Sequence, residues 1–543
     1  MNESEPLLPS LNVSGKQKTT KRAVAVIVVV IAAVTLAVGF GWSGNWEKGS
    51  HRVDWEALSR EIEEVRVDWN TAGLAVGVVQ DGKLVFGKGF GVRNEHGDSV
   101  TCDTLFAIGS TTKAFTSFTF GTLVDDGKID WETKITNVSN VQFQDPIAHS
   151  QANFIDLMSH RTGLPRHDFL FYVAKSVNDI NSKIKYLQPS KEFRESFQYN
   201  NHMFNLVGSI SGKLYGSSWG KLVHERVLKP LRMTRTETDF SLLQTHKDHS
   251  RGFRTVKGKL VAYPYEGIGG LVENEEPDGS MVSSVNDLAK WVTLINNKGI
   301  HGNGTRLISE AQFSKITTPH IIVPNRTPDD YPVQLSSYGL AWTIESYRGV
   351  TSIQHGGAVE GFTTMILTFP AKNAAVIALS NANSDVSPAL FLGNIVTDRV
   401  LFPEVSYDWS GIFKNKLREA EHAREEARKE TIKKRKKESL PSFGLSKYEG
   451  IFTHAVYGTI QLKQFGNDHF ANFAWSADLE TPARITGVIG HWEYDVFGAF
   501  EMPVADYKDY EVPALLFKFQ NFGVDEFLVQ VEEGVDQVLF KRV

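Results

Sequence analysis

The stretch Phe106-Ala-Ile-Gly-Ser110-Thr-Thr-Lys113-Ala-Phe-Thr-Ser-Phe-Thr-Phe120 predicts a turn followed by a buried helix. Ser110 stands at the start of that helix, where backbone N–H groups are unpaired and the helix dipole is positive. Lys113 follows three residues later, and helix positions i and i+3 share one face with Cβ atoms about 5–6 Å apart. The spacing therefore places an amine beside a hydroxyl, as in an activated nucleophile. The alternative is that Ser110 only caps the helix and Lys113 lies on the surface.

The composition is that of a folded protein without a strong charge. Of 543 residues, 41% are hydrophobic and 22% are charged, which suits a globular chain with ample core. The net charge is −5, so we expect no nucleic-acid partner. Cys102 is the only cysteine, which excludes an intrachain disulfide and a cysteine-based zinc site. No H-E-x-x-H motif is present, and we predict neither a metal nor a cofactor.

The N-terminal segment is predicted to lie outside the folded part. Residues 1–22 are polar and end in a basic cluster between Lys16 and Arg22, and residues 23–42 form 20 positions without a charge. A helix of that length spans a hydrocarbon core of about 30 Å, and the preceding positive charges favour a cytoplasmic N-terminus. We therefore expect a cytoplasmic tail, a transmembrane anchor at 23–42 and a single-pass type II membrane protein. The alternative is a cleaved signal peptide with an unusually long apolar region.

Two short motifs bear on the compartment. Residues 3–8, Glu-Ser-Glu-Pro-Leu-Leu, resemble the acidic dileucine signal of endosomal sorting, so we expect the plasma membrane or the endolysosomal system. The main domain would then be extracellular or lumenal. In that setting the N-x-S/T sequons at Asn137, Asn303 and Asn325 would be glycosylation sites.

Residues 54–405 predict an α+β domain. A helix at 54–68 precedes a hairpin at 73–87, in which Asp81-Gly82 makes the turn. Strands return between 351 and 380. Strands at both ends with helices between them predict one antiparallel sheet that the two ends of the domain close.

Two helices in the middle of this domain carry clear signals. The apolar spacing from Met203 to Leu214 predicts one of them. The other begins at Ser284, where the Ser284-x-x-Asp287 pattern predicts an N-terminal cap, and stops at Gly299.

The last part of the chain changes character twice. Residues 410–440 are charged and polar on all sides, which predicts a solvated helical linker. From 445 to 543 apolar and polar residues alternate, which predicts a separate all-β domain, a small barrel or sandwich.

Two further segments could join Ser110 and Lys113 in one cleft. Tyr199 and Asn201 are two residues apart on a loop, where the phenol can relay a proton and the amide can hold a substrate carbonyl and orient the lysine. His355-Gly-Gly357-Ala358 would let the backbone pass close to a ligand, so that the N–H groups of Ala358 and Ser110 form an oxyanion hole. The alternatives are a helix cap at Asn200 or Asn201 and a hairpin corner at His-Gly-Gly.

Taken together and in this order, the three segments resemble the serine β-lactamase-like and penicillin-binding-protein family. The resemblance is to its class C, D-alanyl carboxypeptidase and esterase branch, in which the second motif is Tyr-x-Asn and the third is Lys or His followed by x-Gly. Residues 157–165 and 277–284 are similar to further loops of this family, and the resemblance covers about residues 54–400. Residues 447–452 are similar to the lipocalin-like domain that some members append at the C-terminus.

The resemblance implies a serine hydrolase that works through an acyl-enzyme on Ser110. Lys113, in its neutral form, and Tyr199 would move the protons, while Asn201, His355, Gly357 and Ala358 would bind the substrate or the oxyanion. Because class C enzymes carry a lysine where this chain has His355, a substrate carboxylate would be held weakly. The expected activity is therefore that of a peptidase, amidase or esterase on a small-molecule or peptide substrate. Some members form assemblies, so an oligomer is allowed.

Two other interpretations compete with this one. Gly216-Ser-Ser218-Trp-Gly220 matches the nucleophile elbow of α/β-hydrolases, but it follows a predicted helix where that motif requires a strand. The more serious rival is a catalytically silent scaffold or extracellular matrix protein with the same fold. Retention of Ser110, Lys113 and Tyr199 argues against a scaffold, which needs none of them.

Overall fold

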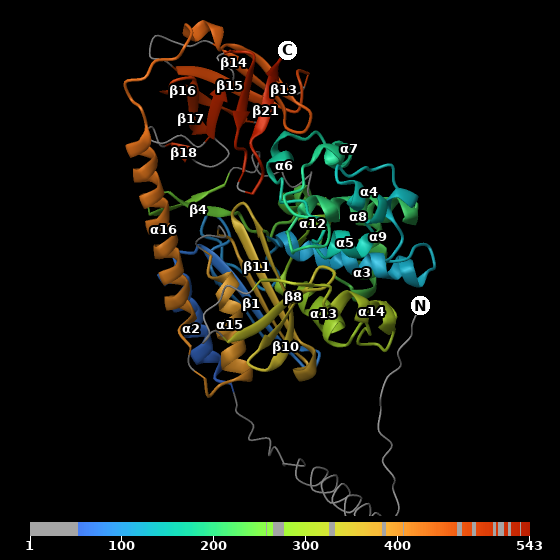
Figure 1. Ribbon diagram of the computed structural model, residues 1–543. Helices are drawn as coiled ribbons and strands as arrows, with labels where there is room; N and C mark the ends of the chain where they lie inside the picture. Colours follow the sequence, from blue (N-terminus) through green and yellow to red (C-terminus); the bar gives the residue numbers. More distant parts are fainter. Residues whose placement is uncertain are drawn as a thin grey trace, which may run out of the picture. The chain divides into compact units, whose positions relative to one another are not determined.

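A computed structural model describes residues 53–256, 258–263, 276–324, 332–382, 387–405, 407–463, 470–480, 485–502, 507–508, 515–519, 523–532 and 534–543 (Figure 1). The chain divides into two compact units, Met1–Val53 and Asp54–Val543. The second unit contains every element discussed below.

The predicted membrane topology is corrected by the structure. The segment predicted as the anchor, 23–42, lies outside the described residues. In the described part of the chain, no helix is both long and apolar enough to cross a membrane. The 26-residue α16 (Trp409–Lys434) has the length but carries charges along all of it. This finding contradicts the predicted single-pass type II location, extracellular or lumenal, and we do not retain it.

The predicted hairpin forms one edge of an antiparallel sheet. Strands β1 (Gly73–Gln80) and β2 (Lys83–Gly91) flank a turn in which Asp81 has φ +49° and Gly82 has φ +72°. Two positive φ angles match the right-handed twist of the flanking strands, which is why an Asp-Gly pair is favoured there. The hairpin prediction is confirmed.

The two ends of the predicted α+β domain meet in this sheet, as expected. β1 pairs with β12 (Ala374–Ser380) in antiparallel register, with Leu74 opposite Ser380. The eight strands run in the order β2-β1-β12-β11-β10-β9-β8-β7, and the remaining bounds are β11 Phe362–Phe369, β10 Val350–Val359, β9 Thr343–Tyr347, β8 Val333–Tyr338 and β7 Ile321–Ile322.

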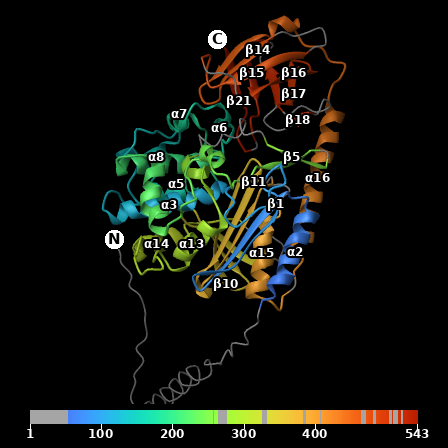
Figure 2. The same ribbon diagram turned by 180° about the vertical axis from the view of Figure 1, so that it is seen from behind.

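Helices cover both faces of the sheet (Figures 1 and 2). The N-terminal helix α2 (Trp55–Asp68) and the helix α15 (Ala389–Leu401) lie together, and an Arg399–Glu61 ion pair of 2.7 Å joins them. On the opposite face, α13 (Val285–Asn296) packs against β1 and β12. It belongs to a helical layer whose other members are α3 Thr112–Asp125, α4 Pro146–Gln151, α5 Phe154–Met158, α6 Phe169–Val173, α7 Val177–Lys183, α8 Asn201–Tyr215, α9 Trp219–Val223, α10 Lys229–Leu231, α12 Glu276–Gly279 and α14 Glu310–Thr317. Two small ladders complete the domain: β3 (Phe106–Ala107) with β6 (Val282–Ser283), and β4 (Phe253–Val256) with β5 (Lys259–Ala262).

Helix α3 lies at the centre of the helical layer. Residues 112–123 of this 14-residue helix are all buried, as its nearly uniform apolar surface predicts. Phe115 stacks on Trp291 of α13 with ring centroids 4.1 Å apart. The cap of α13 is also as predicted, because the Ser284 side chain accepts a hydrogen bond from the Asp287 N–H at 3.3 Å. These contacts fix the helix that carries Lys113.

The C-terminal part is a closed β-barrel. After α16, eight strands form a ring that β16–β17 pairing closes, and β18 pairs with β17 outside the ring. The bounds are β13 Gly450–His454, β14 Gly458–Lys463, β15 Phe470–Ser476, β16 Ile485–Glu493, β17 Val496–Met502, β18 Tyr507–Lys508, β19 Leu515–Phe519, β20 Glu526–Val529 and β21 Val538–Arg542. Buried aromatic side chains such as Phe452, Trp475 and Phe527 fill its interior. The predicted all-β fold of this region is therefore found as a barrel.

Candidate active site

Ser110 and Lys113 lie beside each other. Ser110 belongs to a short 3-10 turn, Gly109–Thr111, that leads into α3, and Lys113 lies in the first turn of α3. The Lys113 side-chain nitrogen Nζ is 3.0 Å from Ser110 Oγ and donates to the Asp278 carbonyl oxygen at 2.8 Å. Lys113 is completely buried, so the alternative of a surface lysine is wrong.

Asp278 is a buried carboxyl group that sequence reasoning missed. Its side chain is 1% exposed, and its Oδ2 is 3.9 Å from Lys113 Nζ. Burial raises the pKa of Asp278 to about 8, although the positive charge of Lys113 acts in the opposite direction. The group is therefore mostly protonated at neutral pH. The segment 277–284 was recognised only as a loop before a helix, and nothing in it distinguished Asp278.

Tyr199 lies between two cationic side chains. The centroid of its ring is 5.1 Å from Lys113 Nζ and 5.2 Å from Cζ of Arg166. The imidazole ring of His160 packs on it with centroids 4.2 Å apart. Among the described residues, the Tyr199 hydroxyl makes no hydrogen bond to Ser110 or Lys113. The structure thus brings the phenol next to the lysine without a direct link between them.

The two asparagines after Tyr199 have different roles. Asn200 is the N-terminal cap of α8 and accepts from the Met203 N–H at 3.2 Å. The Asn201 amide donates to Asp168 Oδ1 at 3.0 Å, and its Oδ1 is buried without a partner in the described part of the chain. The cap alternative therefore fits Asn200 and not Asn201. No hydrogen bond joins Asn201 to Lys113 within the described residues, and the Asp278 carbonyl holds the lysine instead.

The third segment lies inside a strand. His355, Gly357 and Ala358 all belong to β10, and the chain turns only after Val359, so the hairpin-corner alternative is wrong. A Cβ atom on Gly357 would lie 1.9 Å from the Ile108 carbonyl oxygen. One on Gly109, where φ is +50°, would lie 2.6 Å from the Ala358 nitrogen. The two glycines therefore allow β10 to pass directly along the turn that carries Ser110, with Ala358 exposed at its end.

His355 is neutral and fully engaged. Its Nδ1 faces the Gly356 carbonyl oxygen at 2.5 Å, which can only accept, so Nδ1 carries the proton. Nε2 then accepts from the Tyr338 hydroxyl at 2.8 Å. Burial, with a smaller effect of Lys113, lowers the pKa of His355 to about 4. At neutral pH this histidine offers no positive charge to a substrate.

Comparison with known proteins identifies the family. The family model described as Beta-lactamase matches residues 58–392. The chain belongs to the beta-lactamase family. It is 28% identical over 466 residues to "Unguisins hydrolase ungD'" of Aspergillus campestris, covering 81% of this chain and 84% of that protein. It is 24% identical to "Unguisins hydrolase ungD" of Aspergillus violaceofuscus, covering 75% of this chain and 76% of that protein.

Solved structures share the fold of this beta-lactamase family member. An octameric penicillin-binding protein homologue from Pyrococcus abyssi superimposes with a TM-score of 0.58 at 20% identity, covering 90% of this chain and 100% of the other. A D-amino acid amidase from Ochrobactrum anthropi gives a TM-score of 0.51 at 20% identity, covering 64% of this chain and 98% of the other. The predicted family is confirmed. The class C and esterase branch and the lipocalin-like domain stay predictions.

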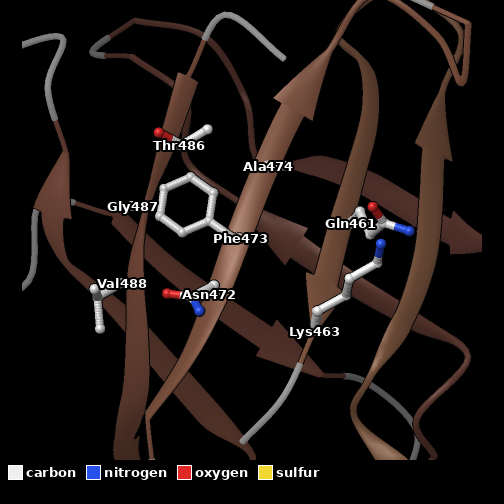
Figure 3. A pocket seen from close by; sticks show the side chains of 8 residues that line it. All are labelled: Gln461, Lys463, Asn472, Phe473, Ala474, Thr486, Gly487 and Val488. Carbon is white, nitrogen blue, oxygen red and sulfur yellow. The ribbon is translucent and has the colours of Figure 1, made fainter. Parts of the chain in front are cut away.

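A separate hollow lies on the barrel of this beta-lactamase family protein. It has a volume of about 340 Å³, and its lining comes from three neighbouring strands (Figure 3): Gln461, Lys463, Asn472, Phe473, Ala474, Thr486, Gly487 and Val488. None of the predicted site residues lines it. The candidate active site is therefore assigned from the Ser110–Lys113 geometry and not from this hollow.

Two of the three predicted glycosylation sites lie in the described part of the chain. Asn137 and Asn303 are exposed, and Asn325 lies outside the described residues. Their glycosylation stays a prediction. Ser218, the nucleophile of the rival motif, caps α9 by accepting from the Lys221 N–H at 3.1 Å. It therefore occupies the helix-ending turn that the sequence indicates and not a strand-to-helix elbow.

Proposed function

We propose that this protein is a serine hydrolase that cleaves amide or ester bonds through an acyl-enzyme on Ser110. The observation that carries the proposal is the contact of 3.0 Å between Lys113 Nζ and Ser110 Oγ, made by a lysine with no exposed surface. A buried amine beside a hydroxyl can take its proton, which is what a serine nucleophile requires. A scaffold would have no use for a lysine in this place, because burying an ammonium group is costly.

The proposed reaction has two stages. Neutral Lys113 accepts the proton of Ser110 Oγ as this oxygen attacks the substrate carbonyl carbon, and the negative charge moves to the carbonyl oxygen. The N–H groups of Ser110 and Ala358 stabilise that oxyanion, and each such donor is typically worth about 100- to 1000-fold in rate. The amine or alcohol then leaves with a proton delivered through Lys113 and Tyr199. In the second stage, water attacks the carbonyl carbon of the ester on Ser110 and gives a proton to Lys113. The bond to Ser110 Oγ then breaks, Oγ takes the proton back from Lys113, and the carboxylic acid product is released.

The neutral charge of His355 limits the class of substrate. A neutral histidine that is already bonded to Tyr338 and Gly356 does not attract a carboxylate. This favours a peptidase, amidase or esterase over a dedicated β-lactamase. The names of the two relatives are those of hydrolases, which supports a hydrolase here.

The experiment is covalent labelling of the purified full-length chain. A fluorophosphonate and a penicillin are each added, the intact mass is measured, and the adduct is mapped by peptide analysis. We expect an adduct on Ser110 that is absent in Ser110→Ala and unchanged in Ser218→Ala, the matched control for the rival motif. A folded wild-type chain that reacts with neither reagent would favour the silent scaffold, and an adduct on Ser218 would assign a different nucleophile.

A further inference from the structure

We infer that the C-terminal barrel is a positioning element of the active site, because it holds the loop 164–169 that carries Arg166 and Asp168 against Tyr199 and Asn201. This inference rests on the proposed function and adds to it a task for the second domain. The evidence is an alternation along residues 166–169: residues 167 and 169 contact the barrel, and residues 166 and 168 contact the active site.

Two residues of the loop are held by the barrel. His167 is 2% exposed, and its Nδ1 accepts from the hydroxyl of Tyr457 at 2.8 Å. The direction of this bond follows from Nε2, which faces the Gln188 carbonyl oxygen at 3.2 Å and must carry the proton. The N–H of Phe169 donates to Oε2 of Glu532 at 2.7 Å. Tyr457 and Glu532 both belong to turns at one end of the barrel.

An apolar contact accompanies the two hydrogen bonds. The ring of Phe169 packs on Trp475 of β15 with centroids 4.5 Å apart. Phe169 is 9% exposed and Trp475 is fully buried. The Trp475 indole nitrogen donates to the Tyr457 carbonyl oxygen at 2.5 Å, which orders the turn that holds His167. Two residues after the end of α6, Lys175 forms an ion pair with Asp478. The loop is thus fixed by buried groups and not by surface charges alone.

The residues that alternate with these two face the active site. Arg166 lies over the ring of Tyr199, and Asp168 accepts from the amide of Asn201. An Arg166–Asp168 ion pair, with Nε–Oδ2 at 2.6 Å, joins the two side chains. The backbone adds a further link, because the Asn200 amide donates to the Pro165 carbonyl oxygen at 2.5 Å. A shift of His167 or Phe169 would therefore move the groups that orient Tyr199 and Asn201.

Such a shift would affect the reaction because catalytic groups tolerate little displacement. A misplacement of about 1 Å can lower a rate by about 100-fold. Loss of a single hydrogen bond in the support is a milder change, for which we expect about a fivefold effect. The barrel residues touch no substrate in this proposal. They act only through the loop.

The test compares four variants of the full-length chain. Glu532→Ala and Tyr457→Phe remove the two hydrogen bonds, and Glu532→Gln keeps an acceptor oxygen for the Phe169 N–H. Tyr448→Phe is the matched control, since Tyr448 is also a buried barrel tyrosine with a hydrogen-bonded hydroxyl, but this hydroxyl donates to Asp495 within the barrel. Two quantities are measured: hydrogen exchange of the amides in 164–173 and 198–203, and the second-order rate at which a fluorophosphonate labels Ser110.

We expect Glu532→Ala and Tyr457→Phe to speed exchange in both segments and to slow labelling about fivefold. Glu532→Gln should restore both quantities, and Tyr448→Phe should change neither. Unchanged exchange at 198–203 in Glu532→Ala and Tyr457→Phe would overturn the inference, and so would faster exchange with an unchanged labelling rate. If the wild-type chain reacts with neither a fluorophosphonate nor a penicillin, the proposed function fails, and the exchange data alone decide whether the barrel holds the loop.

Discussion

Substitution of Gly357 by alanine tests the oxyanion hole most directly. The added methyl group would lie 1.9 Å from the Ile108 carbonyl oxygen, which is a backbone atom and cannot rotate away. A carbon atom and a carbonyl oxygen approach each other to about 3.3 Å at the closest. The difference, about 3.3 minus 1.9, requires strand β10 and the Ser110 turn to separate by about 1.4 Å.

That separation would move the Ala358 N–H away from the position that the oxyanion occupies. Loss of one oxyanion donor typically lowers the rate by about 100- to 1000-fold. We therefore expect the second-order rate of Ser110 labelling by a fluorophosphonate to fall by about 100-fold in Gly357→Ala. Intact mass measured against time gives the labelling rate.

The neighbouring glycine provides the control. A methyl group on Gly356 would have the Leu390 Cδ2 atom as its nearest neighbour at 3.5 Å, an ordinary contact. We expect Gly356→Ala to label at nearly the wild-type rate and both variants to remain folded by circular dichroism. Equal labelling rates in the two variants would refute the placement of the oxyanion hole between Ser110 and Ala358.

Three further predictions concern the buried ionisable groups. Lys113→Met should keep the fold by circular dichroism and slow Ser110 labelling by at least about 100-fold, as expected for loss of a general base, and rapid labelling would assign the base elsewhere. Because His355 is neutral in the folded chain with a pKa of about 4, below the unfolded value of about 6.5, the stability that it confers is lost as the pH falls through this window. In urea unfolding, the free energy of unfolding should thus fall between pH 7 and pH 4, and this fall should be about 3 kcal/mol smaller in His355→Gln than in the wild type. Equal falls in the two proteins would contradict the prediction. The pH dependence that Asp278 contributes has the opposite sign, because its folded pKa of about 8 lies above the unfolded value. The free energy of unfolding should therefore fall as the pH rises from about 4 to about 8, and it should fall less in Asp278→Asn. An identical pH dependence in the two proteins would show that Asp278 ionises normally.

Much of the α+β domain follows from local sequence signals. The Asp81-Gly82 turn, the phenylalanine-rich α3 and the Ser284 cap each have a local physical cause, and each appears where it was predicted. The Ser110–Lys113 contact follows from helix geometry alone. The closed barrel needed more than local signals, because alternation indicates strands and does not say whether β16 will pair with β17.

The tertiary part of the site could not be predicted from residue types. The Tyr-x-Asn spacing predicts an asparagine that orients the lysine, yet Asn201 is bonded to Asp168 and the lysine is held by the carbonyl of residue 278. Every residue of the chain offers the same main-chain carbonyl group, so no side-chain pattern marks the one that Lys113 reaches. The same holds for the support from the barrel, where Tyr457 lies 290 positions after His167. Side-chain motifs therefore identify the groups that we propose to react, while the groups that hold them in place are found only once the backbone is folded.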